Sequence, residues 1–373
     1  MRKILCNIAL ACTIVLVAFW LYLSREKGHP RENFEFFFQT FRENYALFDV
    51  KNIDWDNLHA QYAYKVNGST TDEDLYQIFQ EILQKLDDKH CYIYRFNEIY
   101  FSGFGLPSLN YWDLLSFDFR LPTNDFSLKL IEEKYLSKGF EKSLRIHSLL
   151  PPIGMRDIFT TGWLRDSIAY IHMTEMSNKS EEVHNAISGF FEKYQKADGF
   201  VVDVRDNIGG YSMPAKEIAE SFADEKRLYA ISRVRKPNNI YSYKNPEYWT
   251  IQPNSGINLS NRPVALLINE NTQSAAELFT LMMKALPNVK LIGDTTSGVF
   301  ADTHIGKLPN GWEYRLSVRK TNDCNDNPLE DIGIAPDTTI LNSKEDLEQG
   351  KDKVIEYAIN SLSSNLDKEA LSN

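Results

Sequence analysis

The sequence predicts an α/β fold in which a layered sheet is covered by helices. From about residue 161, short apolar runs typical of buried strands alternate with longer amphipathic segments typical of helices. The predicted strands are 167–173, 199–205, 262–269 and 289–293, and the helices between them are 181–196, 212–224 and 274–286. Near the end of this region, the Asn-Gly of PNGW predicts a hairpin between strands 301–308 and 313–318. Such alternation is typical of a sheet with helices packed against it.

Composition and charge narrow the class of protein. The chain has 373 residues, of which 13% are aromatic and 25% charged, as expected for a globular protein with a large core. Its net charge of −10, without a large cluster of Lys and Arg, argues against a nucleic-acid-binding surface. We therefore expect no nucleic acid among its partners.

The amino terminus predicts a membrane anchor. Residues 4–23 form a predominantly apolar run about as long as a bilayer-spanning helix of roughly 20 residues. The run is longer than the apolar part of a usual signal peptide, about 7–15 residues, and no small-residue cleavage site follows it. We expect residues 1–28 to be an uncleaved signal anchor with the body on the extracytoplasmic side, periplasmic or cell-surface. A cleaved signal is the alternative.

The remaining chain is expected to form four segments. Aromatic residues at helical spacing predict a small helical domain over 29–95, with the aromatic stripe in its core. Residues 96–160, punctuated by Gly and Pro, are interpreted as a cap over the core. The α/β core is assigned to 161–343, and 344–373 are expected to be a polar helix that frays at its end.

Ser274 lies where a predicted strand gives way to a predicted helix, in NENTQSAAELF. Ser274-Ala-Ala-Glu277 matches a capping box, in which serine and glutamate satisfy the first helical N–H groups reciprocally. The second interpretation is that Ser274 is a nucleophile, because free N–H groups and the helix dipole at such a turn favour an oxyanion. The four residues alone do not decide between these interpretations.

A second candidate functional turn is DVRDNIGGYS, residues 203–212, where a predicted buried strand is followed by paired glycines. Glycines let the backbone approach a ligand closely and expose N–H groups to an anion. The alternative is an ordinary tight turn. A phosphate-binding loop is excluded, because no Gly-Lys-Ser/Thr follows.

The sequence carries no sign of a metal or cofactor. The seven histidines are scattered, and neither a His-Glu-x-x-His motif nor paired cysteine spacing occurs. We expect no cofactor and no metal. Cys91 and Cys324, the cysteines outside the apolar run, could form a disulfide or remain two free thiols.

Five sequence blocks in order carry a resemblance to a known family. They are DVRDNIGG, ALLINENTQSAAELF, LIGDTTSG, LPNGWEYRLS and LEDIGIAPD, within residues 200–340. This region resembles the tail-specific, or carboxy-terminal processing, serine proteases and their tricorn-core relatives. NFEFFFQTFRENYALFD and LQKLDDKHCYIY resemble the helical amino-terminal part of the branch with tricorn and the interphotoreceptor retinoid-binding modules. The resemblance implies a ClpP/crotonase-like layered β–α catalytic core.

The resemblance implies catalytic roles for particular residues. Ser274 corresponds to the family's nucleophile, and the backbone N–H groups of Ala275 and Gly210 correspond to its oxyanion hole. The counterpart of the lysine base in the serine-lysine members is Val299, so a serine-lysine dyad is not expected. The tricorn-like branch takes its base from a histidine in an L-x-D-x-H pattern, which places His90 in that role. An imidazole can accept the serine proton near neutral pH.

Three further positions complete the site that the resemblance implies. Glu330, in EDIGIAPD, corresponds to the family's supporting acid, although Asp331 replaces a usual glycine and leaves the choice of carboxylate open. Lys89 stands where tricorn has a serine before the histidine, so the relay that orients the base is altered. His304 is a rival base, with packing in a strand as its alternative interpretation.

Two functions follow from the resemblance. The first is an extracytoplasmic serine endopeptidase that hydrolyses unfolded proteins or peptides through an acyl-enzyme. The second is an inactive family member that binds apolar ligands or peptides, as the retinoid-binding relatives do. Many processing proteases also insert a peptide-gripping PDZ domain, so residues 96–160 are either a cap or a degenerate PDZ-like insertion, represented at most by SGFGLPS.

Overall fold

The computed structural model describes residues 29–95, 98–103, 109–110, 128–147, 155–165, 167–176, 181–236 and 239–372. The chain divides into two compact units. The first, the helical unit, contains the residues up to Leu109 with Pro237–Tyr241 and Thr303–Ser317, and the second, the sheet unit, contains the others. The predicted anchor, residues 1–28, lies outside the described residues. Among the residues that are described, no helix is both long and apolar enough to span a bilayer.

The core of the helical unit is aromatic. Its helices are α2 (Pro30–Asn44), α3 (Trp55–Ala63) and α4 (Asp72–Leu86). α4 begins at a capping box, in which Thr71 and Asp74 each accept a hydrogen bond from the other's backbone N–H. Phe37 of α2 packs on Phe79 of α4 with 4.4 Å between ring centroids, and both are fully buried. The aromatic residues at helical spacing therefore form a core, as the sequence predicts.

The sheet of the helical unit joins segments that are far apart in the chain. Its order is β13-β14-β1-β2-β3, with β1 at Tyr92–Arg95, β2 at Glu98–Phe101, β3 at Leu109–Asn110, β13 at Thr303–Lys307 and β14 at Glu313–Ser317. β13 and β14 are antiparallel, so the predicted Asn-Gly hairpin is confirmed. The hairpin belongs to the helical unit, however, and not to a contiguous core over 161–343. It does so because β14 pairs with β1 and Trp312 packs edge-on against Tyr76, with 5.7 Å between rings.

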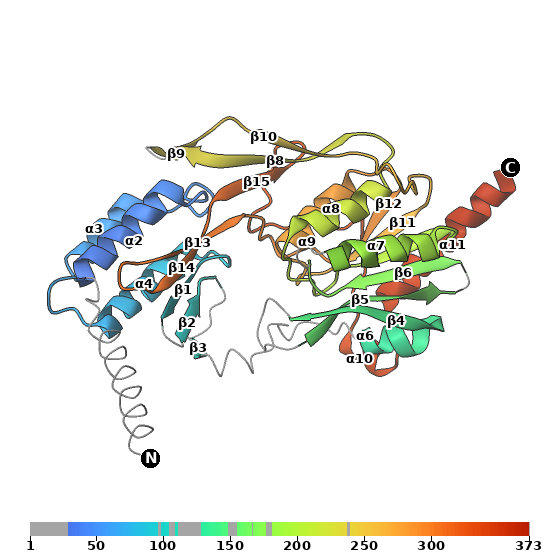
Figure 1. Ribbon diagram of the computed structural model, residues 1–373, viewed down its shortest axis with the longest axis horizontal. Coiled ribbons are helices and arrows are strands. Elements are labelled where there is room, and N and C mark those ends of the chain that lie inside the picture. The colour runs from blue at the N-terminus through green and yellow to red at the C-terminus, as the bar shows by residue number, and fades with distance from the viewer. Residues whose placement is uncertain are drawn as a thin grey trace, which may run out of the picture. The chain divides into compact units, whose positions relative to one another are not determined.

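The sheet unit is built on seven strands (Figure 1). In spatial order they are β16 (Thr338–Thr339), β12 (Val289–Gly293), β11 (Val264–Ile268), β7 (Gly199–Asp203), β6 (Ile168–Met173), β5 (Met155–Leu164) and β4 (Leu136–His147). Neighbouring strands from β16 to β6 are parallel, and β5 and β4 continue the sheet antiparallel. The α/β prediction is thus confirmed as a mixed sheet. The predicted cap lies partly outside the described residues, and its described part differs from the prediction because β4 and the start of β5 extend the core sheet.

Helices cover both faces of this sheet (Figure 1). One face packs against α7 (Glu181–Tyr194), α8 (Ser212–Ser221) and α9 (Ala275–Lys284), and the other against α11 (Lys353–Ser372). Alternate residues of each strand enter the two cores: Phe200 and Val202 point to the first, and Val201 to the second. Smaller helical segments are α6 (Leu128–Leu130), η1 (Ile131–Tyr135) and α10 (Lys344–Glu348).

The carboxy-terminal helix corrects a prediction. We expected a polar helix with a frayed end over 344–373, but the first half of α11 is buried against the sheet. The buried residues are Val354, Ile355, Ala358, Ile359 and Leu362. Their spacing is that of one apolar helical face, and this face closes the second core because the parallel strands leave that side of the sheet uncovered.

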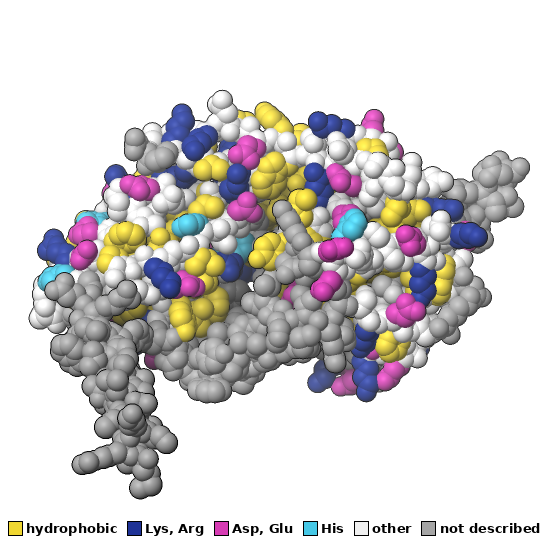
Figure 2. Space-filling model, viewed as in Figure 1, with side chains coloured by type: hydrophobic (Ala, Val, Ile, Leu, Met, Phe, Trp, Pro, Cys, Tyr) yellow, Lys and Arg dark blue, Asp and Glu magenta, His cyan; other side chains and the backbone are white. Residues whose placement is uncertain are grey.

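A smaller antiparallel sheet lies in the sheet unit. Its order is β10-β8-β15, with β8 at Arg227–Lys236, β10 at Glu247–Ile251 and β15 at Arg319–Asp323, and β9 spans Asn239–Tyr243. Figure 2 shows Lys and Arg interspersed with Asp and Glu on the face that it displays. Two ion pairs join strands or turns of the smaller sheet. They are Arg233 with Asp326 at 2.6 Å and Arg319 with Glu247 at 2.8 Å.

A buried ion network fixes the end of β7 to the start of α11. Arg205 donates to the carboxylates of Asp203 and Asp352 at 2.7 and 2.9 Å, and all three side chains are at most 3% exposed. Burial opposes the charge of Arg205, but the two carboxylates raise its pKa above the ordinary value. Asp352 also accepts the N–H of Val354 at 3.0 Å and thereby caps α11.

We expect Asp352→Asn to lower the free energy of unfolding by about 3–5 kcal/mol, because it leaves the buried charge of Arg205 half compensated. The amide keeps an oxygen for the helix cap, so the charge is the main loss. Asp326→Asn is the matched control, since Asp326 is 44% exposed in its own arginine pair and should cost less than about 1 kcal/mol. Urea denaturation of both variants measures the difference. Equal losses would contradict the expectation.

Candidate active site

The serine turn follows β11 and opens α9. Ser274 is the N-cap residue of α9, with φ 55° and ψ −120°, a combination that serine rarely adopts. The preceding loop is fixed by Thr272, whose buried hydroxyl donates to the carbonyl of Val204 at the end of β7. Ser274 itself is half-buried. A residue held in such a strained backbone conformation is a candidate functional residue.

The glycine turn lies directly against the serine turn. Asn207, fully buried, accepts the N–H of Gly209 at 2.9 Å through its side chain, and its carbonyl accepts the N–H of Gln273 at 2.9 Å. Gly209 has φ +94°, and a Cβ there would lie 2.7 Å from the Cβ of Ser274. The two motifs singled out in the sequence are therefore brought together, and glycine is required for their contact.

Two backbone N–H groups next to Ser274 are available as donors. Among the described residues, the N–H groups of Gly210 and Ala275 have no hydrogen-bond acceptor. Ala275 is the first residue of α9, so its N–H also lies at the positive end of the helix dipole. Gly210 is held by a bridge to Met176, where the N–H of Tyr211 donates to the Met176 carbonyl at 2.7 Å. Backbone N–H groups without acceptors are the kind of donor that an oxyanion hole uses.

Gly210→Ala is expected to lower kcat by about 10²–10³-fold, the usual cost of one lost oxyanion donor. Gly210 has φ +135°, and an added Cβ would lie 2.0 Å from the carbonyl oxygen of Met176, so the turn must shift. Gly189→Ala is the control, because Gly189 lies in α7 with nothing within 4 Å of its added Cβ. The measurement is kcat on a peptide substrate, with the melting temperature of each variant. An unchanged kcat for Gly210→Ala would contradict the role.

Glu277 fulfils one half of the predicted capping box and does more. Its carboxylate accepts the N–H of Ser274 at 3.1 Å, and it also accepts three donors from the loop after β12. These are the Thr296 hydroxyl at 2.6 Å, the Gly298 N–H at 2.7 Å and the Val299 N–H at 2.8 Å. The side chain is fully buried. Both interpretations of the S-x-x-E motif are thus compatible in one structure.

The sequence left open whether Glu330 or Asp331 is the supporting acid, and the two differ in their surroundings. Glu330 is 6% exposed and accepts the N–H of Phe300 at 2.9 Å. Asp331 is exposed, with φ 62°, and its N–H donates to the carbonyl of Gly298 at 2.8 Å. Val299, the residue at the position of the family's lysine, is buried. Glu330 is therefore the carboxylate built into the same loop system as Ser274, within the sheet unit.

His90 belongs to the helical unit, at the turn between α4 and β1. It is 5% exposed, and its backbone N–H donates to the side chain of Asp88 at 2.8 Å, which gives the L-x-D-x-H pattern a structural reason. Burial lowers the pKa of His90 to about 3, helped by the charge of Arg315 and opposed by that of Asp88. His90 is therefore a neutral imidazole at physiological pH. The rival, His304, is exposed on β13.

Two regions of the chain match models of known protein families. The model of Peptidase family S41 matches residues 167–340, and that of the Tricorn protease C1 domain matches residues 27–84. Residues 167–340 are thus similar to peptidase family S41, and we refer to them as the S41 domain. Ser274, Gly210, Ala275 and Glu330 all lie within it. His90 lies between the two matched ranges.

Individual relatives of the S41 domain are distant. The chain is 25% identical over 203 residues to a carboxyl-terminal-processing protease of Synechocystis, covering 54% of this chain and 44% of that protein. It is 28% identical over 204 residues to the tricorn protease of Thermoplasma acidophilum, covering 53% and 17%. The chain thus spans less than half the length of these curated relatives.

Solved structures resemble more of the chain. A crystal structure of a putative peptidase from Parabacteroides merdae is 27% identical, with a TM-score of 0.70 over 90% of this chain and 97% of that one. The photosystem II D1 carboxy-terminal processing protease has a TM-score of 0.54 at 14% identity, over 83% and 93%. This second likeness concerns the fold alone.

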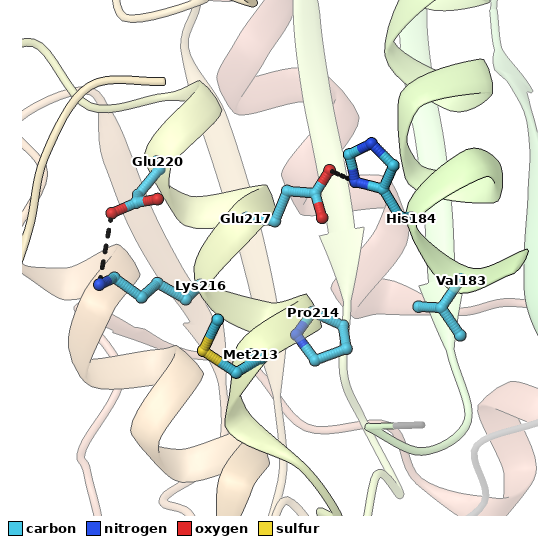
Figure 3. A pocket seen from close by; sticks show the side chains of 7 residues that line it. All are labelled: Val183, His184, Met213, Pro214, Lys216, Glu217 and Glu220. Atoms are coloured by element: carbon cyan, nitrogen blue, oxygen red, sulfur yellow. Dashed lines mark ion pairs between the residues drawn. The ribbon is translucent and has the colours of Figure 1, made fainter. Parts of the chain in front are cut away.

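A pocket of about 240 Å³ lies between α7 and α8 of the S41 domain (Figure 3). Val183, Met213 and Pro214 supply its apolar lining. The charged groups around it are paired, His184 with Glu217 at 2.8 Å and Lys216 with Glu220 at 3.6 Å, as the dashed lines of Figure 3 mark. None of the predicted site residues lines the pocket, although α8 begins two residues after Gly210.

The cysteines and possible metal ligands can be described briefly. Cys91 is buried and Cys324 exposed, and both are free thiols, so the disulfide alternative is not realised. Burial raises the pKa of the Cys91 thiol well above its ordinary value. Within the described ranges, no group of His, Cys, Asp and Glu is arranged to hold a metal ion.

Sequence reasoning missed two contributors to the site. Glu277 was recognised only as a capping partner, although the S-x-x-E motif did place it next to Ser274. Arg315 had no local signal at all. It reaches the vicinity of His90 because β14 pairs with β1, where Arg315 lies opposite Tyr92.

Proposed function

We propose that the protein is a serine endopeptidase that hydrolyses peptide bonds of unfolded proteins or peptides through an acyl-enzyme. The observation that carries this proposal is the packing of the glycine turn on the serine turn. That packing leaves the N–H groups of Gly210 and Ala275 without acceptors beside a strained Ser274. The relatives named as carboxyl-terminal-processing proteases support the substrate class.

In the proposed reaction, the hydroxyl oxygen of Ser274 attacks the carbonyl carbon of the scissile bond while His90 takes its proton. The negative charge that develops on the carbonyl oxygen is stabilised by the N–H groups of Gly210 and Ala275. His90 then returns the proton to the leaving amine, which frees one product and leaves an acyl-enzyme. Water, activated by the same imidazole, hydrolyses the ester and restores Ser274.

The supporting acid has a defined task in this proposal. A buried imidazole with a pKa of about 3 is a weak base, because charging it costs desolvation and brings it near Arg315. A carboxylate that approaches the imidazolium in the reaction would offset that cost. We assign this task to Glu330, which is buried and fixed by the Phe300 N–H.

We also propose an extracytoplasmic location for the body, anchored through residues 1–28. The proposal rests on the apolar run at 4–23. Fractionation of cells that express the full chain, with protease added from outside, tests the location.

Covalent labelling tests the enzymatic proposal directly. The full chain is incubated with a serine-directed fluorophosphonate, and the modified peptide is identified by mass spectrometry. We expect a single phosphonate on Ser274, together with fragments from an unfolded model protein in the unlabelled sample. Absence of both would overturn the peptidase proposal and favour the alternative, an inactive member that binds apolar ligands or peptides. The valine at the lysine position and Lys89 before His90 are the observations that keep this alternative open.

A further inference from the structure

Glu277 connects three segments of the candidate site. One carboxylate oxygen, Oε2, accepts the N–H groups of Ser274 and Val299, and the other, Oε1, accepts the Thr296 hydroxyl and the Gly298 N–H. The first of these is the candidate nucleophile's own backbone. The others belong to the loop after β12, which we call the 296–299 loop.

The 296–299 loop in turn holds the segment that carries the candidate acid. The Thr296 hydroxyl oxygen accepts the N–H of Ile334 at 2.8 Å, and the carbonyl of Gly298 accepts that of Asp331 at 2.8 Å. Phe300, which directly follows the 296–299 loop, donates its backbone N–H to the carboxylate of Glu330. A single buried carboxylate therefore links the serine turn, through one loop, to Glu330.

The chemistry of the four donors suits only the ionised form of Glu277. Three of them are backbone N–H groups, which cannot accept a hydrogen bond. A protonated carboxyl would direct its own O–H at one of these donors, or would force Thr296 to turn its hydroxyl away. Protonation therefore removes at least one of the four hydrogen bonds to Glu277. It also weakens the others, since hydrogen bonds to a charged acceptor are stronger than those to a neutral one.

Burial and the four hydrogen bonds have opposite effects on the pKa of Glu277. Burial raises the pKa of Glu277 to about 7, while the hydrogen bonds from Thr296, Val299, Gly298 and Ser274 lower it. The titratable groups on the contacting loops are Asp294, Glu330 and Asp331, and the lysine at the far end of α9 is Lys284. The main causes of the shift are burial and the four hydrogen bonds, and not these neighbouring charges. The carboxyl thus changes its charge in the neutral range.

We propose that Glu277 is a positioning residue of the candidate site, whose ionised carboxylate holds the serine turn and the 296–299 loop together and whose protonation releases both and stops the reaction. The inference rests on the proposed function. It assigns the control of activity near neutral pH to Glu277 and not to His90. His90 titrates far lower, with a pKa of about 3.

The pH profile of cleavage tests this role. For the full wild-type chain, kcat is expected to fall about tenfold per pH unit below about pH 7 and to level off above about pH 8. In Glu277→Gln, we expect a kcat about 10- to 100-fold lower at pH 8, a KM within about threefold, and no remaining slope between pH 6 and 8. Thr280→Val is the control, because the buried Thr280 hydroxyl donates to the carbonyl of Ala276 within the same helix and not to the 296–299 loop.

A second variant guards against misfolding of Glu277→Gln. Thr296→Val removes one of the four donors to Glu277, so the pH at which kcat is half maximal should rise by about one unit. An unchanged pH profile in both variants would overturn the inference while the proposed function stands. If the wild type at every pH neither reacts with the fluorophosphonate at Ser274 nor forms fragments, the proposed function itself is overturned.

Discussion

Replacing Ser274 with alanine is expected to reduce kcat for peptide-bond hydrolysis by about 10⁴- to 10⁶-fold, to the level of the uncatalysed sample in most assays. The reason is that the proposed reaction begins with a bond from the serine oxygen, which alanine lacks. The fold should be unaffected, because the backbone of the turn is held by Glu277 and Asn207. The measurement is fragment formation from an unfolded model protein, followed by gel electrophoresis.

A buried serine elsewhere in the sheet unit provides the matched control. Ser221 is fully buried in α8, and its hydroxyl donates to the carbonyl of Glu217 in the same helix. Ser221→Ala should cleave like the wild type. Cleavage that continues in Ser274→Ala would show that another residue is the nucleophile, or that a contaminating protease makes the fragments.

Replacing His90 with alanine is expected to lower kcat by about 10²- to 10⁴-fold, the usual contribution of a general base. The loss should persist at every pH between 5 and 9, because the wild-type imidazole is already neutral throughout this range, with a pKa of about 3. His304→Ala is the control, since His304 is exposed on β13. A loss of activity in His304→Ala with none in His90→Ala would transfer the role of base to His304.

The same variant has a second signature in stability. The pKa of His90 is lower in the folded chain than its unfolded value of about 6.5, so the unfolded state binds the proton more readily. The part of the unfolding free energy that depends on neutral His90 is therefore fully present above about pH 6.5. It is lost as the pH falls from there toward 3. His90→Ala should flatten this part of the profile of unfolding free energy against pH. An equally steep loss of stability in the variant would contradict the low pKa.

The sequence was sufficient for the layered core and for the positions of the serine and glycine turns. Parallel strands buried on both faces are continuous apolar runs such as VALLI, and the helices between them carry one apolar face, so both are visible locally. The same holds for the turns, because Gly209, Gly210 and Ser274 occupy backbone conformations whose residue preferences are local. Ser274 and the glycine turn follow neighbouring parallel strands, β11 and β7, and so meet at one edge of the sheet.

Tertiary structure decided the rest, because it depends on contacts between residues far apart in the chain. The hairpin of β13 and β14 belongs to the helical unit only because β14 pairs with β1, and this pairing also brings Arg315 toward His90. The burial of α11 depends on an uncovered face of the sheet. Above all, the charge state of Glu277 depends on burial and on donors from a loop about twenty residues away, and no local pattern encodes an electrostatic environment.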